Sequence, residues 1–378
     1  MKILKKPVLP IGFRAGGTSC CIKKSGKKDL ALIYSDKIAT AAGVFTTNKL
    51  QAAPVKVNKI YLSDNRAQAV IVNSGNANCM TKTRGFRDAI KMTSVVAKNL
   101  KIKTKNVLVA STGIIGKPLP MDKIKKGIPE LVKKTKRSGI SDAASAIMTT
   151  DRNPKSIALK IMIDSKAVTI CGIAKGAGMI YPNMATMLSF ITTDAAIAAS
   201  ALKKALKVAV YNSFNCITVD GCMSTNDMVL IMANGYAQNR KINATDKAFD
   251  RFSKAINYVC LELAKKIIYD AEGATKFIQI KVKGAKISQD AKKAAFAVAN
   301  SNLLKTAVFG ENRNLGRIYS ALGQTGININ ENRIKVSTTS FKNKNIKITI
   351  NLNMGKSEST VYTSDLSTGY VRINARYN

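Results

Sequence analysis

The sequence predicts a mixed α/β fold in which helices pack in layers on β-sheets. Apolar or alternating segments typical of strands are interleaved with amphipathic helical segments along the chain. Two strand-like segments, Ile157 to Ile163 and Val168 to Ile173, flank Asp164-Ser165-Lys166 and predict a hairpin. Strands and helices alternate along the chain, but a hairpin requires antiparallel strands. We therefore expect an α+β layered arrangement rather than a simple doubly wound parallel sheet.

The other predicted strands are short apolar or alternating runs. They cover Leu30 to Tyr34, Ala69 to Val72, Val107 to Ala110, Met187 to Thr192, Met228 to Met232, Phe277 to Val282, Ile334 to Ser337 and Ile346 to Leu352. The second of these runs leads into Asn73 to Asn78, where three asparagines and a glycine favour a turn. That turn can border a site.

Helical periodicity is clearest from Lys247 to Ile268, where large apolar residues recur at intervals of three and four. Ala195 to Val210 is a second predicted helix, with Asp194 as its N-cap. Phe86 to Leu100 and Met121 to Lys134 also favour helices. We expect Pro129 to interrupt the latter, because proline lacks a backbone N–H group.

The bulk composition is that of a folded globular protein. The 378 residues suffice for two domains or one large domain, and 46% hydrophobic with 22% charged residues is ordinary for such a protein. The N-terminus has no signal-peptide pattern, and no apolar run approaches the ~18–20 residues that span a bilayer. We therefore expect a soluble, cytoplasmic protein without a membrane partner.

The seven cysteines are scattered without a CxxC pair, and the chain contains no histidine. This spacing does not support a zinc site, so we expect no metal and reduced cysteines that mostly fill core positions. The net charge is +39, but lysines occur along the entire length without a basic tail or an aromatic stacking platform. We therefore expect no nucleic-acid partner.

Residues 172 to 194 are the most informative stretch. A glycine-rich polar turn, Lys175 to Asn183, leads into Ala185-Thr186 and then into an apolar run. Without histidine, the Thr186 hydroxyl cannot be activated by a Ser-His-Asp or Cys-His arrangement. If the Ala185-Thr186 bond breaks, however, the freed α-amine of Thr186 can act as the base. The alternative is a β-branched residue that simply begins a strand.

Other polar residues stand at the ends of predicted elements. Thr112 and Gly113 follow the strand that ends at Ala110, and they can form an oxyanion hole or an ordinary turn. Thr149 and Lys175 lie inside or next to strand or helix ends, and Lys175 can hold a carboxylate. Glu272 can receive a substrate ammonium group, although each of these residues alone is more often a cap or a solvated charge.

Taken together, ordered motifs over nearly the whole chain resemble the ornithine acetyltransferase family, also called glutamate N-acetyltransferase, of cyclic arginine biosynthesis. The matching stretches are Gly12 to Ala15, Val44 to Asn48, Asn73 to Asn78, Ser111 to Gly113, Met148 to Asp151, Lys175 to Asp194, Ser213 to Asn215, Ile217 to Gly221, Ser224 to Asp227, Glu272 to Lys276, Phe309 to Glu311 and Ile373 to Ala375.

The resemblance implies self-cleavage at Ala185-Thr186 into chains 1–185 and 186–378, which stay together as an α2β2 heterotetramer. It implies Thr186 as nucleophile and Thr112 with Gly113 as oxyanion hole. The implied substrate-binding residues are Thr149, Lys175, Thr186, Glu272 and Asn374. The implied fold is similar in design to N-terminal-nucleophile hydrolases but distinct in topology.

The implied reaction moves an acetyl group from N2-acetyl-L-ornithine to L-glutamate in a ping-pong cycle that needs no cofactor. Acetyl-CoA is a further possible donor. The sequence departs from the family at Leu315 and Cys222, and it ends at Asn378, where we expect a usual substrate contact to be missing. Two alternatives stay open: a related self-processing aminopeptidase or amidase, and a degenerate basic binding protein.

Overall fold

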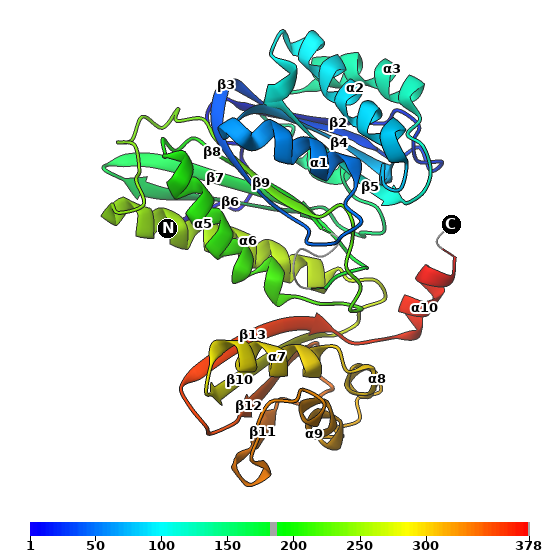
Figure 1. Cartoon of the computed structure of the whole chain (residues 1–378), viewed down its shortest axis with the longest axis vertical. Helices are drawn as coiled ribbons and strands as arrows, with labels where there is room; N and C mark the ends of the chain where they lie inside the picture. The colour runs from blue at the N-terminus through cyan, green and yellow to red at the C-terminus, as the bar shows by residue number, and fades with distance from the viewer. Residues whose placement is uncertain (182–186, 377–378) are drawn as a thin grey trace. The chain divides into compact units, whose positions relative to one another are not determined.

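The computed structural model describes residues 1–181 and 187–376. The bond between Ala185 and Thr186 and the last residue, Asn378, lie outside the described residues. The chain forms two compact units (Figure 1). The first comprises residues 1–176, 183–215 and 223–264, and the second comprises residues 177–182, 216–222 and 265–378. Both contain helices packed on sheets, so the predicted mixed α/β class is confirmed.

The first unit contains a nine-stranded mixed sheet. Its strand order is β1-β6-β7-β8-β9-β3-β4-β5, with β2 also paired to β3. The strands are β1 (Lys2–Ile3), β2 (Phe13–Thr18), β3 (Leu30–Phe45), β4 (Arg66–Asn76), β5 (Val107–Ile114), β6 (Lys155–Ile163), β7 (Lys166–Lys175), β8 (Leu188–Thr193) and β9 (Met228–Ala233). The pairs β4–β5 and β8–β9 are parallel, whereas the others are antiparallel.

The helices of this unit are α1 (Ala53–Tyr61), α2 (Lys82–Leu100), α3 (Met121–Lys134), α4 (Ile140–Ala146) and α5 (Ala199–Tyr211), together with most of α6 (Lys247–Tyr269). Helices α1 to α3 pack against β3, β4 and β5 through one core that includes Met92, Ile128 and Ile71. A second core joins residues of β2 to β4 with residues of β6 to β9. Figure 1 shows α5 and α6 beside β6 to β9.

The second unit contains a four-stranded sheet with the order β11-β12-β10-β13. Its strands are β10 (Phe277–Ala285), β11 (Lys335–Thr338), β12 (Asn345–Asn351) and β13 (Ser357–Ser364). Its helices are α7 (Ser288–Ala299), α8 (Asn302–Phe309), α9 (Gly316–Gly323) and α10 (Thr368–Ala375). The apolar faces of β10 and β12 pack on α7 to α9 around Ile280, Ile348 and Phe296.

Most predicted strands are confirmed, including the β6–β7 hairpin. Its register runs from Lys155↔Ala174 to Ile163↔Lys166. Asp164 and Ser165 form the turn with φ values of 46° and 62°, which match the primed turns that suit the twist of a hairpin.

Three local predictions are wrong. Helix α5 begins at Ala199, because Ile197 bridges Ile242, and Asp194 instead accepts the Thr169 amide at 2.7 Å. Pro129 lies inside α3 without ending it; buried Ile124 and Ile128 anchor the helix, and the carbonyl freed by Pro129 belongs to exposed Lys125.

The third wrong prediction is the turn at Asn73 to Asn78, because β4 continues to Asn76. Here the Asn73 side chain donates to the Asn76 carbonyl at 2.8 Å and accepts from Ser111 Oγ at 2.6 Å. These side-chain bonds satisfy the polar groups that otherwise favour a turn.

No disulfide joins any of the seven cysteines, all of which lie in the described ranges, and Cys79, Cys171, Cys216 and Cys260 are buried as the sequence predicts. No helix in residues 1–181 or 187–376 is both long enough and apolar enough to cross a membrane.

Candidate active site

Lys175 joins two other predicted site residues, Thr112 and Thr149, in the first unit. It is the last residue of β7, and only 2% of its surface is exposed. Its ammonium group donates to Thr149 Oγ1 at 2.7 Å and to Thr112 Oγ1 at 3.4 Å. Thr112 comes from the end of β5, and Thr149 comes from the loop between α4 and β6. A single buried cation therefore holds two hydroxyl groups from separate segments.

Asp151 balances the charge at this cluster. Its carboxylate lies 2.7 Å from Lys155 Nζ and 3.9 Å from Lys175 Nζ. It also accepts the backbone amides of Gly176 at 2.7 Å and Thr149 at 2.9 Å. Burial favours the neutral acid, but the two ammonium groups and the hydrogen bonds outweigh it and lower the pKa of Asp151. Asp151 is therefore an ionised anchor that orients Lys175 and Thr149.

Gly113 lies where the parallel pair β4–β5 becomes irregular. Gly75 pairs with Gly113, and the register shifts at Asn76. Gly113 has a φ of +133°, and a Cβ atom added to it would lie 2.3 Å from the Gly75 carbonyl carbon. Only glycine fits this backbone. Register irregularities of this kind are common beside active sites, where they redirect backbone groups.

Asn226 connects the loop before β9 to these strand ends. Its side-chain amide donates to the carbonyl oxygens of Ala77 at 2.6 Å and Ser111 at 2.8 Å. Its own oxygen accepts from Thr225 Oγ1 at 2.6 Å. Sequence reasoning assigned no role to Asn226, although it stands among polar residues immediately before a wholly apolar strand.

The first residues of β8 lie beside this cluster. Leu188 pairs with Lys175 on one side and with Met228 on the other. The preceding amide, Met187 N, donates to Asp227 Oδ1 at 2.9 Å. Ala185 and Thr186 are outside the described residues, but Thr186 is covalently bonded to Met187. The predicted nucleophile is thus two positions from a residue paired with Lys175.

The other two predicted substrate-binding residues meet in the second unit. Asn374 Nδ2 donates to Glu272 Oε2 at 2.8 Å. The Glu272 amide donates to the Ala177 carbonyl at 3.0 Å. A Cβ atom on Gly178 would lie 2.2 Å from Glu272 Oε2, so glycine is required for this carboxylate to lie against the backbone. Glu272 is 8% exposed, and Asn374 supplies a neutral partner.

Asp220, also in the second unit, was not identified as a site residue from the sequence. It accepts the amides of Met179 at 2.6 Å and Ile180 at 2.9 Å, together with the Tyr370 hydroxyl at 3.1 Å. Burial and the Asp220 carboxylate raise the pKa of Tyr370, which therefore remains a neutral donor. Asp220 fixes the segment that precedes residue 182.

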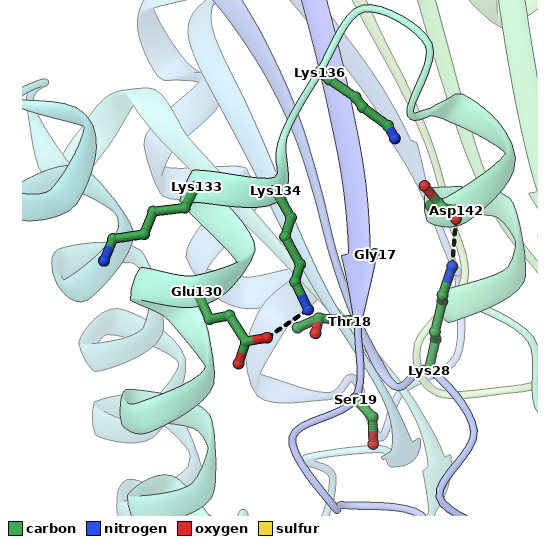
Figure 2. Close-up of a pocket in the computed structure, with 9 residues that line it drawn as sticks. All are labelled: Gly17, Thr18, Ser19, Lys28, Glu130, Lys133, Lys134, Lys136 and Asp142. Atoms are coloured by element: carbon green, nitrogen blue, oxygen red, sulfur yellow. Dashed lines mark hydrogen bonds and ion pairs between the residues drawn. The ribbon is translucent and has the colours of Figure 1, made fainter.

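A separate cavity of about 690 Å³ in the first unit contains none of the predicted site residues (Figure 2). Four lysines line it, and ion pairs join Lys28 to Asp142 and Lys134 to Glu130. In the described ranges, no group of three or more Cys, Asp or Glu side chains could hold a metal ion.

Comparison with known proteins shows which family the sequence matches. The ArgJ family profile matches residues 14–342 and 337–378. The Arginine biosynthesis bifunctional protein ArgJ of Geobacter sulfurreducens is 46% identical over 387 residues, which cover 97% of this chain and 98% of that protein. The protein of the same name from Caldanaerobacter subterraneus is 49% identical over 331 residues, which cover 87% of this chain and 82% of the relative.

Among solved structures, ornithine acetyltransferase complexed with ornithine from Mycobacterium tuberculosis is 39% identical. The match covers 48% of this chain and 97% of that chain, with a TM-score of 0.45. The family profile and the two curated relatives confirm the resemblance inferred from the ordered motifs. The chain belongs to the ArgJ family.

Proposed function

We propose that this chain is an acetyltransferase of arginine biosynthesis that transfers the acetyl group of N2-acetyl-L-ornithine to L-glutamate through an acetyl-Thr186 intermediate. The observation that carries this proposal is the cluster around Lys175. The lysine contacts Thr112 and Thr149, and it pairs with Leu188, two positions after Thr186. The contact with Thr112 and the pairing with Leu188 support a site in which the expected oxyanion hole serves the predicted nucleophile.

Self-cleavage would generate the base that the reaction needs. Thr186 Oγ bonds to the Ala185 carbonyl carbon, the bond from that carbon to the Thr186 nitrogen breaks, and the nitrogen takes up the hydroxyl proton. Water then hydrolyses the resulting ester, which frees the Ala185 carboxyl group and restores the Thr186 hydroxyl. The new α-amine can accept a proton near neutral pH, as histidine does in other acyl transferases.

The pairing of the sheet supports stable association of chains 1–185 and 186–378. Strand β8 lies between β7 and β9, and β9 pairs with β3. Cleavage between residues 185 and 186 would leave one hydrogen-bonded sheet built from both chains. We propose that two such pairs form the α2β2 heterotetramer.

In the transfer reaction, Thr186 Oγ attacks the acetyl carbonyl while the Thr186 amine takes the hydroxyl proton. Thr112 and Gly113 stabilise the oxyanion, and the proton passes to the departing N2 nitrogen of ornithine. The glutamate amine then attacks the acetyl ester and returns a proton to the Thr186 oxygen through the same amine. Thr149, Lys175, Glu272 and Asn374 bind the two amino acids.

The names of the relatives describe bifunctional proteins. We propose acetyl-CoA as a second donor, because it can acylate the same threonine without another nucleophile. The chemistry requires neither a metal nor an organic cofactor, and we propose that it takes place in the cytoplasm.

Thr186→Ala tests the proposal. The variant should remain a single chain and should transfer no acetyl group, because both the hydroxyl nucleophile and its role in cleavage are lost. Full acetyl transfer by this variant would overturn the assignment. In the wild-type protein, acetyl recovered on glutamate supports a transferase, whereas acetyl recovered mainly as acetate would favour the related amidase.

A further inference from the structure

Asp227 has a buried carboxylate oxygen for which the described residues provide no hydrogen-bond partner. The residue precedes β9 and is 1% exposed. Its Oδ1 accepts the Met187 amide at 2.9 Å, but its Oδ2 is unpaired among the described residues. A buried polar oxygen without a partner costs about 1–3 kcal/mol, so a group that completes its hydrogen bonding is expected.

Covalent geometry identifies one such group. Met187 is bonded to Thr186, and only three covalent bonds separate the two backbone nitrogens. A carboxylate that holds one backbone amide through one oxygen can therefore bond the preceding backbone nitrogen through the other, which here is the nitrogen of Thr186. In the uncleaved chain that nitrogen is an amide, whereas self-cleavage converts it into an amine with additional donors.

The charge around Asp227 fits this assignment. Burial raises the pKa of Asp227 well above its usual range, and the Met187 amide, the Lys175 ammonium and the Ser224 hydroxyl oppose that rise only in part. Lys175 is the charged group that acts on it, and Lys175 is itself paired with Asp151. A cationic amine freed nearby would supply the partner that an ionised Asp227 otherwise lacks.

We propose that Asp227 is a positioning residue for the nucleophile: Oδ1 fixes the Met187 amide, and Oδ2 accepts a hydrogen bond from the α-amine that cleavage frees at Thr186. This inference rests on the proposed function. The Thr186 hydroxyl, its amine and Asp227 then act as a triad in which the carboxylate orients the base and stabilises its protonated form. The proton moves from the Thr186 hydroxyl to the amine and from there to the departing nitrogen, and Asp227 neither gains nor loses one.

Asp227→Asn in the full chain tests this role. The amide oxygen can still accept the Met187 N–H, but the NH2 group cannot accept a bond from the Thr186 amine. Self-cleavage, followed by intact mass over time, should slow by at least about tenfold. In the cleaved fraction, the maximal acetylation rate should fall about 10–100-fold. Because a neighbouring carboxylate raises an amine pKa, the acid limb of that rate should move to lower pH by about one unit.

Asp194→Asn is the matched control. Asp194 is also a buried carboxylate of the first unit that accepts backbone amides, from Thr169 at 2.7 Å and from Ile11 at 3.1 Å. Among the residues that the structure describes, its hydrogen bonds reach none of the predicted site residues. This variant should cleave at the wild-type rate and keep the wild-type pH profile, even if its unfolding free energy falls.

Unchanged cleavage and an unchanged pH profile in Asp227→Asn would overturn the inference while leaving the proposed function intact. Failure of the wild-type protein to cleave and transfer would instead refute the proposed function. If Asp227→Asn does not accumulate as folded protein, Asp227→Glu provides the test. The displaced carboxylate in Asp227→Glu should slow cleavage, but the acid limb of the acetylation rate should stay at its wild-type pH. Cleavage at the wild-type rate in this variant would overturn the inference.

Discussion

Lys175 Nζ lies 3.4 Å from Thr112 Oγ1, although 63 positions separate the two residues in the sequence. The contact exists because β7 ends at Lys175, where the end of β5 also lies. The same ammonium contacts Thr149 and Asp151, so one buried side chain connects the expected oxyanion hole to an ionised anchor.

Removing the Lys175 ammonium should reduce acetyl transfer more than it reduces stability. Lys175→Met keeps the length of the side chain but leaves the Thr149 and Thr112 hydroxyls without their donor, at a cost of about 1–3 kcal/mol in unfolding free energy. Asp151 retains Lys155 at 2.7 Å. The rate of acetyl transfer, measured with radiolabelled N2-acetyl-L-ornithine, should fall by about 10²-fold. Urea unfolding of the same variant measures the loss of stability.

Lys155→Met is the companion variant, because Lys155 Nζ pairs with the same carboxylate at 2.7 Å and donates to the Asn153 carbonyl at 3.3 Å. It should lower the unfolding free energy comparably and preserve more of the transfer rate. Equal loss of transfer in both variants would show that Lys175 acts only through Asp151.

Gly113→Ala should disrupt the strand end. The added Cβ would lie 2.3 Å from the Gly75 carbonyl carbon, which costs about 1–3 kcal/mol from overpacking. The positive φ adds about 1–2 kcal/mol. Gly116 also has a positive φ, of +86°, but a Cβ atom added there would meet no atom within 4 Å.

We expect the transfer rate of Gly113→Ala to fall by a factor of about 10²–10³, which is the usual effect of losing an oxyanion donor. Gly116→Ala should keep most of its activity. Thermal unfolding and steady-state kinetics of both variants check this expectation. Similar kinetics in the two variants would argue against an oxyanion role for Gly113.

Glu272→Gln should weaken the ornithine half-reaction selectively. Ornithine carries a side-chain ammonium that glutamate lacks, and a hydrogen bond between charged groups is worth about 1.5–3 kcal/mol. We expect KM for N2-acetyl-L-ornithine to rise about 10–100-fold, with a smaller change in KM for glutamate. Glu311→Gln is the control, because Glu311 is an exposed carboxylate paired with Lys276 at 2.6 Å. Equal effects on both substrates would place Glu272 outside the ornithine site.

The pH dependence of stability should contain a contribution from Asp151. Its pKa is lowered in the folded state, so its stabilising effect is present above the unfolded pKa of about 3.9 and is lost as pH falls toward the folded value. The unfolding free energy can be measured in urea from pH 3 to pH 7 for Thr186→Ala and for the double variant Thr186→Ala/Asp151→Asn. Below about pH 4 it should fall more steeply in Thr186→Ala than in the double variant. Parallel curves would contradict the ionised anchor.

The sequence predicted elements whose pattern is local. Alternation in Ile157 to Ile163 and the spacing of Phe252, Ile256 and Val259 are sufficient to identify a strand and a helix, because they reflect one buried face. Strand β13, Ser357–Ser364, escaped prediction because it is rich in serine and threonine. Its pairing with β10 supplies the stabilisation that its composition does not indicate.

Within the candidate site, residue types and motif matches predicted roles for Thr112, Thr149, Lys175, Glu272 and Asn374, and these roles stay predictions. The contacts that join Lys175 to Thr112 and Asn374 to Glu272 depend on tertiary structure. Asp227 escaped prediction because an acid before an apolar strand is usually a cap or a solvated charge. Its burial distinguishes it, together with an oxygen that has no hydrogen-bond partner among the described residues.

The most direct test of the central claim is the intact mass of the purified, denatured protein with and without N2-acetyl-L-ornithine. We predict two fragments, residues 1–185 and residues 186–378, and one acetyl group added to the second fragment after exposure to the donor. A single uncleaved chain without an acetyl group would contradict the proposed processing, the assigned nucleophile and the acetyl-enzyme mechanism together.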